Sequence, residues 1–484
     1  MAELFEGMKP NNLWKHFAEF LKIPRCSGNE RAIGDYIVSV AKNLDLEWKR
    51  DDVGNVIVSK PGSAGHENAE GVVLQGHLDM VCEKNSDVDH DFKKDAIKAH
   101  IKGEWVKAEG TTLGADNGIG CCAALAIMED KSLIHPPLEF LFTVDEETGL
   151  TGARKVPTDF LKGRKMLNLD SEDEGEFTIG CAGGADTQIF LPFKREKSIA
   201  AEGYIIKLSG LRGGHSGIDI NQGRGNAIKL LARVLWQTAS SVSYDLVSFE
   251  GGNLRNAIPR EAWAHVLIDA SNREQFSSAA QESFDKIKSE YRALEKDIAL
   301  NIQKSEEVSP ARIPEDVQKN LINILLTLPH GVIAMNPEIE GLVETSNNLA
   351  VVRMKDSQAG IVCSTRSSVA SALEATREAL SALADLANAE VTLEEGYPGW
   401  KPDLQSPILK TLKEVYKHTF NTEPKVAAVH AGLECGIIGE KFPGMDMISF
   451  GPTIQHPHSP DERIHIGSVE KFWTFLTTVL KELT

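Results

Sequence analysis

A chain of 484 residues is too long for a single compact core, so we expect at least two domains. Hydrophobic residues make up 42% of the sequence and charged residues 25%, which is typical of a soluble globular protein. The 70 acidic residues outnumber the 52 basic ones and give a net charge of −18. Because so negative a surface repels phosphate backbones, we expect no nucleic-acid partner.

The sequence shows no targeting or membrane segment. Residues 1–24 lack the basic stretch followed by an apolar stretch that marks a secretory signal. No run of about 18 uncharged apolar residues occurs, so we expect no membrane span and no membrane partner. The seven cysteines form no Cys-x-x-Cys pair, and we predict that all seven are free thiols packed as small buried side chains. Free thiols suit a reducing compartment, so the predicted location is cytoplasmic.

The first 190 residues alternate helical and strand patterns. Residues 17–23 and 32–44 have the apolar spacing of amphipathic helices, and residues 121–130 have the small side chains of a helix packed on a sheet. Short apolar runs with the length of buried strands lie between the helices, at residues 55–60, 71–75, 138–144 and 165–169. This alternation predicts an α/β domain with a largely parallel sheet and flanking helices.

From about residue 190 to residue 395 the pattern changes to that of an α+β domain. Longer helices with polar faces are expected at residues 225–239, 277–300 and 371–387. Strands separated as in hairpins are expected at residues 204–211, 244–252, 262–270, 349–355 and 359–366.

Strand-length apolar runs return after residues 396–400, at 425–432 and 446–451, and a helix is expected at 469–483. We therefore predict one discontinuous catalytic domain, residues 1–190 and 396–484. An inserted α+β lid, residues 191–395, splits it.

Asp116 lies among glycines and small apolar residues, where a carboxylate is costly unless it is paired or binds a metal. Acidic and imidazole side chains also follow four apolar runs. These residues are His77 and Asp79, then Asp145, Glu146 and Glu147, then Asp170, and finally His456, His458, Asp461 and Glu462. Singly, each has an ordinary explanation as a solvated turn, an acidic loop or a helix start. Together they predict a shared site, because ligands gather beyond the carboxyl ends of strands in α/β sheets.

The residue types indicate which metals this site would take. Imidazoles and carboxylates without a thiolate suit zinc, cobalt or manganese better than calcium. Five protein ligands exceed what one catalytic zinc needs, so we predict two divalent ions about 3.5–4 Å apart that share a carboxylate and a water. Nucleotide-binding glycine motifs are absent. A nucleophilic Cys435 beside His430 is a weaker alternative.

Six motifs in chain order resemble the two-zinc exopeptidases related to carboxypeptidase G and aminoacylase, in particular their aminoacyl-histidine dipeptidase (peptidase D) branch. They are GHLDMV, LGADNGIG, TVDEETG, LNLDSEDEGE, HAGLECG and GPTIQHPHSPDE. The resemblance extends into the predicted lid, through GLRGGHSG, GGNLRNAIPREA, LVETSNNLAVV and GYPGW. It implies a zinc-exopeptidase-like fold and a homodimer formed through the lid.

The resemblance also implies a ligand set. Asp116 would bridge two metal ions, next to a cis peptide bond. His77 and Asp170 would complete one ion, and Glu147 and His458 the other. His456 stands two residues before His458, so spacing alone leaves open which imidazole binds; the resemblance favours His458.

Roles in catalysis and substrate binding follow from the same resemblance. Asp79 would orient the histidine that precedes it by two residues. Glu146 would be the general base that activates the metal-bridging water. His215 and Asn256, from the lid, would hydrogen-bond the oxyanion, and Arg366 would bind the substrate carboxylate.

The expected function is a metal-dependent dipeptidase that acts on dipeptides with a free N-terminus, including Xaa-His dipeptides such as carnosine. We expect two zinc ions on this ligand set, with cobalt and manganese as alternatives. Two other functions fit the same residues: an N-acyl amino acid deacylase and an inactive metal-stabilised binding module. Glu146 argues against the inactive module, because a structural metal site needs no free base.

Overall fold

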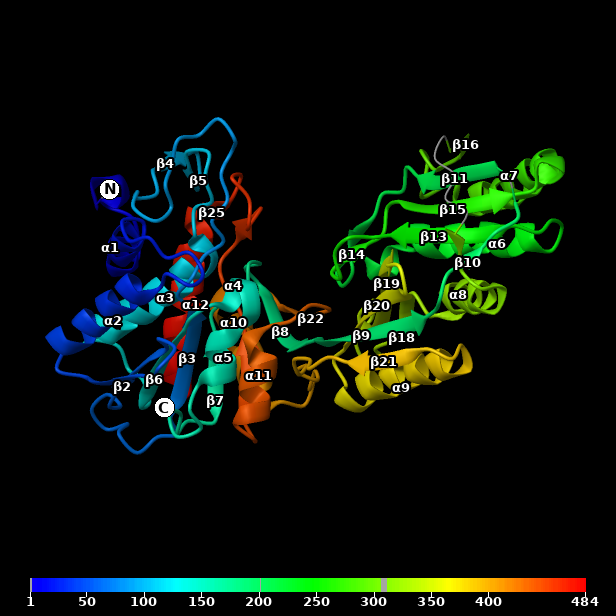
Figure 1. Cartoon of the computed structure of the whole chain (residues 1–484). Coiled ribbons are helices and arrows are strands. Elements are labelled where there is room, and N and C mark those ends of the chain that lie inside the picture. Colours follow the sequence, from blue (N-terminus) through cyan, green and yellow to red (C-terminus); the bar gives the residue numbers. More distant parts are fainter. Residues whose placement is uncertain (1, 201, 306–310) are drawn as a thin grey trace. The chain divides into compact units, whose positions relative to one another are not determined.

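The computed structural model describes residues 2–200, 202–305 and 311–484. The chain forms two compact units (Figure 1). The first unit contains residues 1–181, 400–428 and 433–484, and the second contains residues 182–399 and 429–432. The predicted boundary at residue 190 falls inside strand β9 (Gly183–Pro192), because the pairing of this strand with β20 (Gln358–Ser367) continues to Pro192.

The first unit is built on an eight-stranded sheet with the order β1-β2-β6-β3-β7-β23-β8-β22. The bounds are β1 Glu47–Arg50, β2 Val56–Lys60, β3 Val72–His77, β6 Leu138–Thr143, β7 Lys165–Asn168, β8 Glu176–Cys181, β22 Lys425–Val429 and β23 Asp446–Ser449. Strands β6, β3, β7 and β23 are parallel, whereas β1–β2, β2–β6 and β8–β23 are antiparallel. The predicted α/β fold is confirmed; the parallel strands form the centre of the sheet, and antiparallel pairs lie on either side of them.

The central strands are apolar along their whole length because both faces of the sheet are covered. All six residues of β3 and all six of β6 are buried. In the register of the sheet, His77 lies opposite Thr143 and Gln75 lies opposite Asn168. The carboxyl ends of β3, β6 and β7 therefore lie side by side, and the loops that follow them leave from one edge.

The helices of the first unit have these bounds: η1 Ala2–Phe5, α1 Asn11–Phe20, α2 Arg31–Asn43, α3 Ala115–Glu129, α4 Glu146–Gly149, α5 Thr151–Lys155, α10 Pro407–Phe420, α11 Glu434–Lys441 and α12 Ile466–Glu482. Helix α3 contacts both α1 and β3, and its residues from Ala115 to Met128 are all buried. A helix that is apolar on every side is expected in such a position. Its glycines allow the close approach, since a Cβ on Gly120 would lie 2.5 Å from the carbonyl oxygen of Leu169.

A small sheet of the order β24-β25-β5-β4 completes the first unit. Its strands are β4 Ala99–Lys102, β5 Trp105–Ala108, β24 Ile454–Gln455 and β25 Arg463–His465. Among the described residues, no helix combines the length and the apolar composition needed to cross a membrane.

The second unit contains a nine-stranded sheet of the order β16-β11-β15-β13-β19-β20-β9-β21, with β18 paired to β19. Each of its described strand pairs is antiparallel. Besides β9 and β20, its strands are β11 Glu202–Ser209, β13 Asp245–Gly251, β15 Ala262–Ile268, β16 Ala299–Lys304, β18 Gly331–Met335, β19 Val343–Met354 and β21 Glu390–Leu393. Two short pairs join β10 Glu196–Lys197 to β17 Ala311–Arg312 and β12 Gly214–His215 to β14 Ala257–Ile258.

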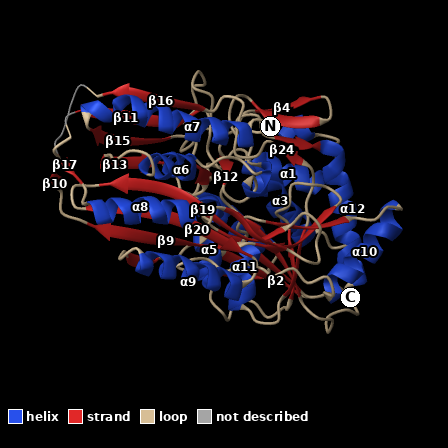
Figure 2. Ribbon diagram, turned by 90° about the vertical axis from the view of Figure 1, so that its right-hand side faces the viewer, coloured by secondary structure: helices blue, strands red, loops and turns tan. Residues whose placement is uncertain are grey.

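Helices of the second unit pack along this sheet (Figure 2). They are α6 Ala227–Ala239, α7 Arg273–Tyr291, α8 Glu315–Thr327 and α9 Ala370–Leu386, with the short η2 Ile220–Gln222 and η3 Ala270–Asn272. A hydrophobic core formed by buried side chains of both the helices and the strands joins them. The prediction of a helix at residues 277–300 is wrong at its C-terminal end, because the helix stops at Tyr291. Ala299 begins β16, since pairing with β11 overrides the local helical pattern.

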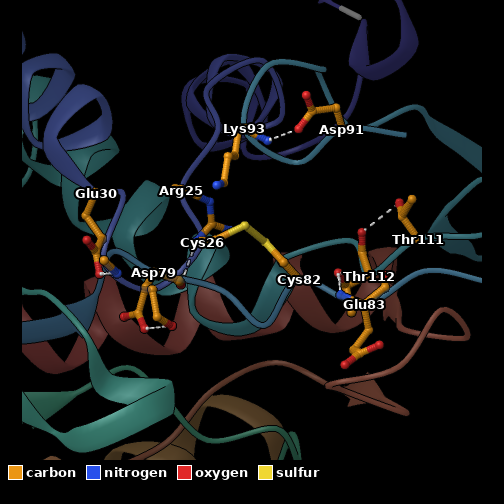
Figure 3. The surroundings of a disulfide bond; sticks show 12 residues. Arg25, Cys26, Glu30, Asp79, Cys82, Glu83, Asp91, Lys93, Thr111 and Thr112 are labelled. Carbon is orange, nitrogen blue, oxygen red and sulfur yellow. Dashed lines mark hydrogen bonds between the residues drawn. A yellow bond between two sulfur atoms is a disulfide. The ribbon is translucent and has the colours of Figure 1, made fainter. Parts of the chain in front are cut away.

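The prediction that all seven cysteines are free is also wrong. Cys26 and Cys82 form a disulfide across a sequence separation of 56 residues, and the other five cysteines are free and buried. Cys26 pairs in a parallel bridge with Met80, so the segment after α1 lies beside the segment after β3 (Figure 3). This proximity arises from tertiary structure, and the cysteine spacing in the sequence carries no sign of it.

Candidate metal centre and active site

Five predicted ligands come together at the carboxyl-terminal edge of the first unit's sheet. His77 is the last residue of β3, Asp170 follows β7 by two residues, and Glu147 lies in the short helix α4 just after β6. Asp116 lies in the first turn of α3, and its peptide bond to the following residue is cis, as the resemblance implies. His458 follows β24 in a loop.

Asp116 stands between two imidazoles. Its Oδ1 lies 3.2 Å from Nε2 of His77, and its Oδ2 lies 3.2 Å from Nε2 of His458. The same nitrogen of His77 is 3.2 Å from Oδ1 of Asp170, and that of His458 is 3.1 Å from Oε2 of Glu147. Two groups that could hold a metal ion therefore share Asp116: His77 with Asp170, and Glu147 with His458.

The electrostatics of this cluster fit positively charged ions. Burial raises the pKa of Asp170 to about 7, which shows the cost of another negative charge there. Burial also opposes ionisation of Asp116, but hydrogen bonds from both imidazoles hold its pKa below the ordinary value. Hydrogen bonds to Asp116 and Glu147 raise the pKa of His458 to about 11. Within the described structure, the buried Oε1 of Glu147 accepts no hydrogen bond, so it is available as a metal ligand.

Asp79 contacts three groups of the cluster. Its Oδ1 lies 3.3 Å from Nδ1 of His77, the ring nitrogen opposite the one that faces the carboxylates. Its two oxygens accept hydrogen bonds from the backbone N–H groups of Glu146 (3.0 Å) and Glu147 (3.1 Å). Burial opposes ionisation, but the hydrogen bond and the charge of His77, followed by the hydrogen bonds from Ser27 and the N–H of Glu146, lower the pKa of Asp79 to about 2. The carboxylate is thus placed to fix both the ring of His77 and the start of α4.

The carboxylate of Glu146 lies in the same cluster but has no hydrogen bond or ion pair among the described residues. A carboxylate oxygen of Glu146 lies within 4.8 Å of ligand atoms of His77 and Glu147. Burial raises the pKa of Glu146 well above the ordinary value. An untied carboxylate beside metal-ligand groups has the properties of a general base.

The structure separates the two histidines that spacing left unresolved. Both residues are exposed, but His458 contacts Asp116 and Glu147, whereas His456 belongs to none of the residue groups that could hold a metal in the described chain. Both residues have positive φ, 56° for His456 and 59° for His458. The loop therefore turns sharply enough for only the second ring to face the cluster.

Two further carboxylates near the centre are not among the five proposed ligands, although Glu462 belongs to the residues that predicted a shared site. The buried Glu434 accepts hydrogen bonds from Nε2 of Gln75 (2.6 Å) and Oγ1 of Thr143 (2.7 Å), and so joins the ends of β3 and β6. Glu462 accepts hydrogen bonds from four backbone N–H groups, those of residues 113–116 at the start of α3. The only sequence signal was their place in HAGLECG and HSPDE, since neither contact follows from local spacing.

The predicted substrate-binding residues all lie in the second unit. His215 ends β12, and its Nδ1 accepts hydrogen bonds from the N–H groups of Gly217 (3.2 Å) and Ile218 (3.1 Å). Asn256 is exposed and directly precedes β14, the partner strand of β12. Arg366 lies buried in β20 and donates to the hydroxyl of Tyr397 at 3.0 Å. Burial and the nearby positive charge of Arg366 lower the pKa of His215, which makes the neutral imidazole the favoured form.

Cys435 does not have the environment of a nucleophile. Its side chain is fully buried, and burial raises the pKa of the thiol well above its ordinary value. Because the thiolate is the reactive form, such a cysteine is chemically inert. His430, the other member of that alternative, lies 2.7 Å from the hydroxyl oxygen of Ser346.

Comparison with known proteins agrees with a peptidase built around these groups. Residues 73–482 match the model of peptidase family M20/M25/M40. The chain belongs to this family.

Two relatives that align over nearly the whole chain are dipeptidases. The chain is 44% identical to the cytosol non-specific dipeptidase of Escherichia coli (strain K12), over 100% of this chain and 99% of the relative. The crystal structure of aminoacylhistidine dipeptidase from Vibrio alginolyticus superimposes with a TM-score of 0.92 at 42% identity, over 99% of this chain and 97% of that chain. The aminopeptidase PepT from Bacillus cereus shares the fold, with a TM-score of 0.57 at 16% identity, over 98% of this chain and 99% of that chain.

Proposed function

We propose that the protein is a metal-dependent dipeptidase that hydrolyses dipeptides with a free N-terminus, Xaa-His dipeptides such as carnosine among them. Two relatives that align over nearly the whole chain carry the names of dipeptidases, one non-specific and one for aminoacyl-histidines. Membership of a peptidase family supports the same conclusion.

The observation that carries the proposal is the position of Asp116, whose two oxygens each face a different imidazole. A carboxylate in this position would bridge two divalent ions. One ion would be held with His77 and Asp170, and the other with Glu147 and His458. We propose zinc as the resident metal, with cobalt and manganese as the alternatives this ligand set accepts.

When bound, such a pair of ions polarises the scissile carbonyl and lowers the pKa of water towards about 7. Glu146 acts as the general base, taking the proton of the attacking water and passing it to the leaving amine. Asp79 keeps the ring of His77 oriented and makes it a better ligand.

His215, Asn256 and Arg366 would recognise the substrate. Arg366 has a buried guanidinium that would bind the C-terminal carboxylate of a dipeptide. His215 and Asn256 would donate hydrogen bonds to the developing oxyanion. We propose that residues 191–395 act as a lid that admits short substrates and excludes long chains.

We further propose a cytoplasmic homodimer formed through the second unit. The cytosolic relative supports the location. Strand β18 supports the dimer, because Val332, Ile333 and Met335 leave 38%, 45% and 47% of their surface exposed on it. Analytical ultracentrifugation tests this directly: a monomer at micromolar concentration would contradict it.

A substrate panel on chelator-treated protein tests the function. The apoprotein is assayed with Ala-His, carnosine and N-acetylhistidine, before and after addition of zinc, cobalt or manganese. A dipeptidase hydrolyses Ala-His only when metal is restored, whereas preferential cleavage of N-acetylhistidine would identify a deacylase. Absence of turnover with every metal and substrate would contradict both activities.

Replacement of Glu146 by glutamine tests the proposed base. We expect Glu146→Gln to lower kcat by about 100- to 10,000-fold, because the amide cannot accept the proton. Metal content, measured by mass spectrometry, should be unchanged, since Glu146 is not a proposed ligand.

The matched control is Glu440→Gln, the same chemical change at an exposed residue of α11. It should keep wild-type kcat. Near-normal turnover of Glu146→Gln would remove Glu146 from the base role.

A further inference from the structure

The disulfide joins two segments that both lead to the proposed metal centre. Figure 3 shows the disulfide with Arg25 and Asp79. Cys26 lies between α1 and α2, and Cys82 lies five residues after the end of β3. Both cysteines are partly exposed, so a small thiol can reach them. The five free cysteines are buried, which confines thiol exchange in the folded protein to this one pair.

The neighbours of Cys26 hold Asp79 from two sides. Arg25 is 3% exposed and donates from Nη1 to the carbonyl oxygens of Leu78 (2.9 Å) and Asp79 (2.8 Å). Its Nη2 donates to the carbonyl oxygen of Gly114, two residues before Asp116. Ser27 donates from Oγ to Oδ2 of Asp79 at 2.8 Å. The residues on either side of Cys26 therefore fix both the backbone and the carboxylate of Asp79.

The other half of the disulfide adjoins the segment that leads into α3. The backbone carbonyl oxygen of Glu83, next to Cys82, accepts a hydrogen bond from the N–H of Thr112 at 2.9 Å. The N–H of Glu83 donates to the hydroxyl of Thr112 at 3.3 Å. Residues 84 and 111 continue this contact as an antiparallel bridge.

From these contacts we propose that Cys26 and Cys82 are a site of reversible thiol–disulfide exchange that controls how firmly Asp79 is held. Asp79 in turn holds the ring of His77 and the backbone of Glu146 and Glu147. The inference rests on the proposed function for its effect on turnover. Its effects on cysteine chemistry and on metal retention do not depend on that function.

A dithiol can supply the two electrons that reduce the disulfide. One thiolate of the dithiol attacks a disulfide sulfur, the S–S bond breaks, and a mixed disulfide forms. The second thiolate displaces the protein sulfur, so that Cys26 and Cys82 become thiols and the dithiol becomes a cyclic disulfide. Oxidised glutathione reverses the change, because the two protein thiols reduce it to two molecules of glutathione.

Counting thiols tests whether the pair exchanges. The zinc-loaded protein is treated with oxidised glutathione or with dithiothreitol, freed of reagent by gel filtration, and alkylated in denaturant. With seven cysteines, of which five are free, mass spectrometry should find five alkylated after oxidation and seven after reduction. Peptide mapping should place the difference at Cys26 and Cys82. Seven alkylated cysteines after oxidation would overturn the proposal.

Metal release and turnover test the consequence. Reduction should speed the transfer of zinc to a chromogenic chelator and lower kcat, each by about 10- to 100-fold, the range seen when groups supporting a metal ligand are lost. Reoxidation should restore both. Equal release rates in the two redox states would overturn the proposal even if all seven thiols were counted as expected.

The double variant Cys26→Ser/Cys82→Ser is the matched control. It should behave like the reduced protein under all conditions and should not respond to either reagent. Ser27→Ala, which removes one contact to Asp79 but keeps the disulfide, should release zinc faster in the oxidised state. If no preparation hydrolyses any dipeptide while zinc release still follows the redox state, the proposed function fails and this inference stands.

Discussion

Individual carboxylates in this protein differ in role because their partners differ. Asp116 faces imidazoles on both sides, Asp79 is held by N–H and O–H donors, and Glu146 is left without a partner among the described residues. A carboxylate tied by hydrogen bonds cannot easily take a proton, whereas an untied one can. The proposed roles of Asp116 as the bridging ligand, Asp79 as the support of His77 and Glu146 as the general base therefore follow from differences in local hydrogen bonding.

Glu462 is the residue on which we expect the start of α3 to depend most. Its two oxygens accept four backbone N–H groups at 2.6–3.3 Å. Glu462→Gln replaces one acceptor oxygen by a donor and leaves buried N–H groups unpaired. We expect the free energy of unfolding to fall by about 3 kcal/mol, measured by urea denaturation of the metal-free protein.

The neighbouring carboxylate supplies the control. Asp461 is exposed and makes one ion pair, 3.5 Å from Nζ of Lys107. Asp461→Asn should change the free energy of unfolding by no more than about 0.5 kcal/mol. If both variants lost the same stability, the cap assigned to Glu462 would be wrong.

At the scale of elements, the small residues of α3 set how closely this helix approaches the sheet. A Cβ on Gly120 would lie 2.5 Å from the carbonyl oxygen of Leu169 and 2.7 Å from Oδ1 of Asn117. Asp170 directly follows Leu169 in the sequence, and Asp116 directly precedes Asn117. The spacing between helix and sheet therefore also sets the spacing between two proposed ligands.

Gly120→Ala tests this dependence. Because the contact is with backbone, the helix must shift, and we expect a loss of about 1–3 kcal/mol in the free energy of unfolding. Zinc affinity, measured by competition with a chelator, should fall as well. Gly71→Ala is the control, since a Cβ there meets its nearest atoms at an ordinary 3.7 Å.

Much of the fold could be predicted because its elements carry strong local patterns. The apolar runs at 71–75, 138–144 and 165–169 correspond to β3, β6 and β7, and the helix predicted at 121–130 corresponds to the C-terminal part of α3, which ends at Glu129. The end of α7 could not be predicted, since the strand that follows it forms only by pairing with β11.

The candidate site was predictable to a similar degree. Acidic and imidazole side chains recur after the apolar runs of the sequence. In the structure, five of these side chains each lie within ion-pair distance of at least one other. Glu434 and the disulfide were not predictable, because their contacts span 291 or more residues in one case and 56 in the other. Long-range contacts of this kind leave no periodic trace in a sequence.

At the scale of the whole molecule, all five proposed metal ligands belong to the first unit. Removing the metal with a chelator should therefore affect the two units unequally. We expect faster amide hydrogen exchange at the end of β3, the start of α3 and the loop around His458, where crowded carboxylates lose the ions that neutralise them.

Hydrogen-exchange mass spectrometry with and without chelator checks this expectation. The nine-stranded sheet of the second unit is the internal control, because no proposed ligand lies on it. Restoring zinc should restore the protection. An equal increase in exchange across both units would contradict the assignment of the metal centre to the first unit alone.

The hydrogen bonds between Glu462 and residues 113–116 join distant parts of the chain, which has a consequence for synthesis of the protein. A nascent chain that has emerged from the ribosome only as far as the second unit lacks both this cap and His458. Such a chain would lack one of the five proposed metal ligands and the cap of α3. We therefore expect a product that stops before residue 458 to hydrolyse no dipeptide.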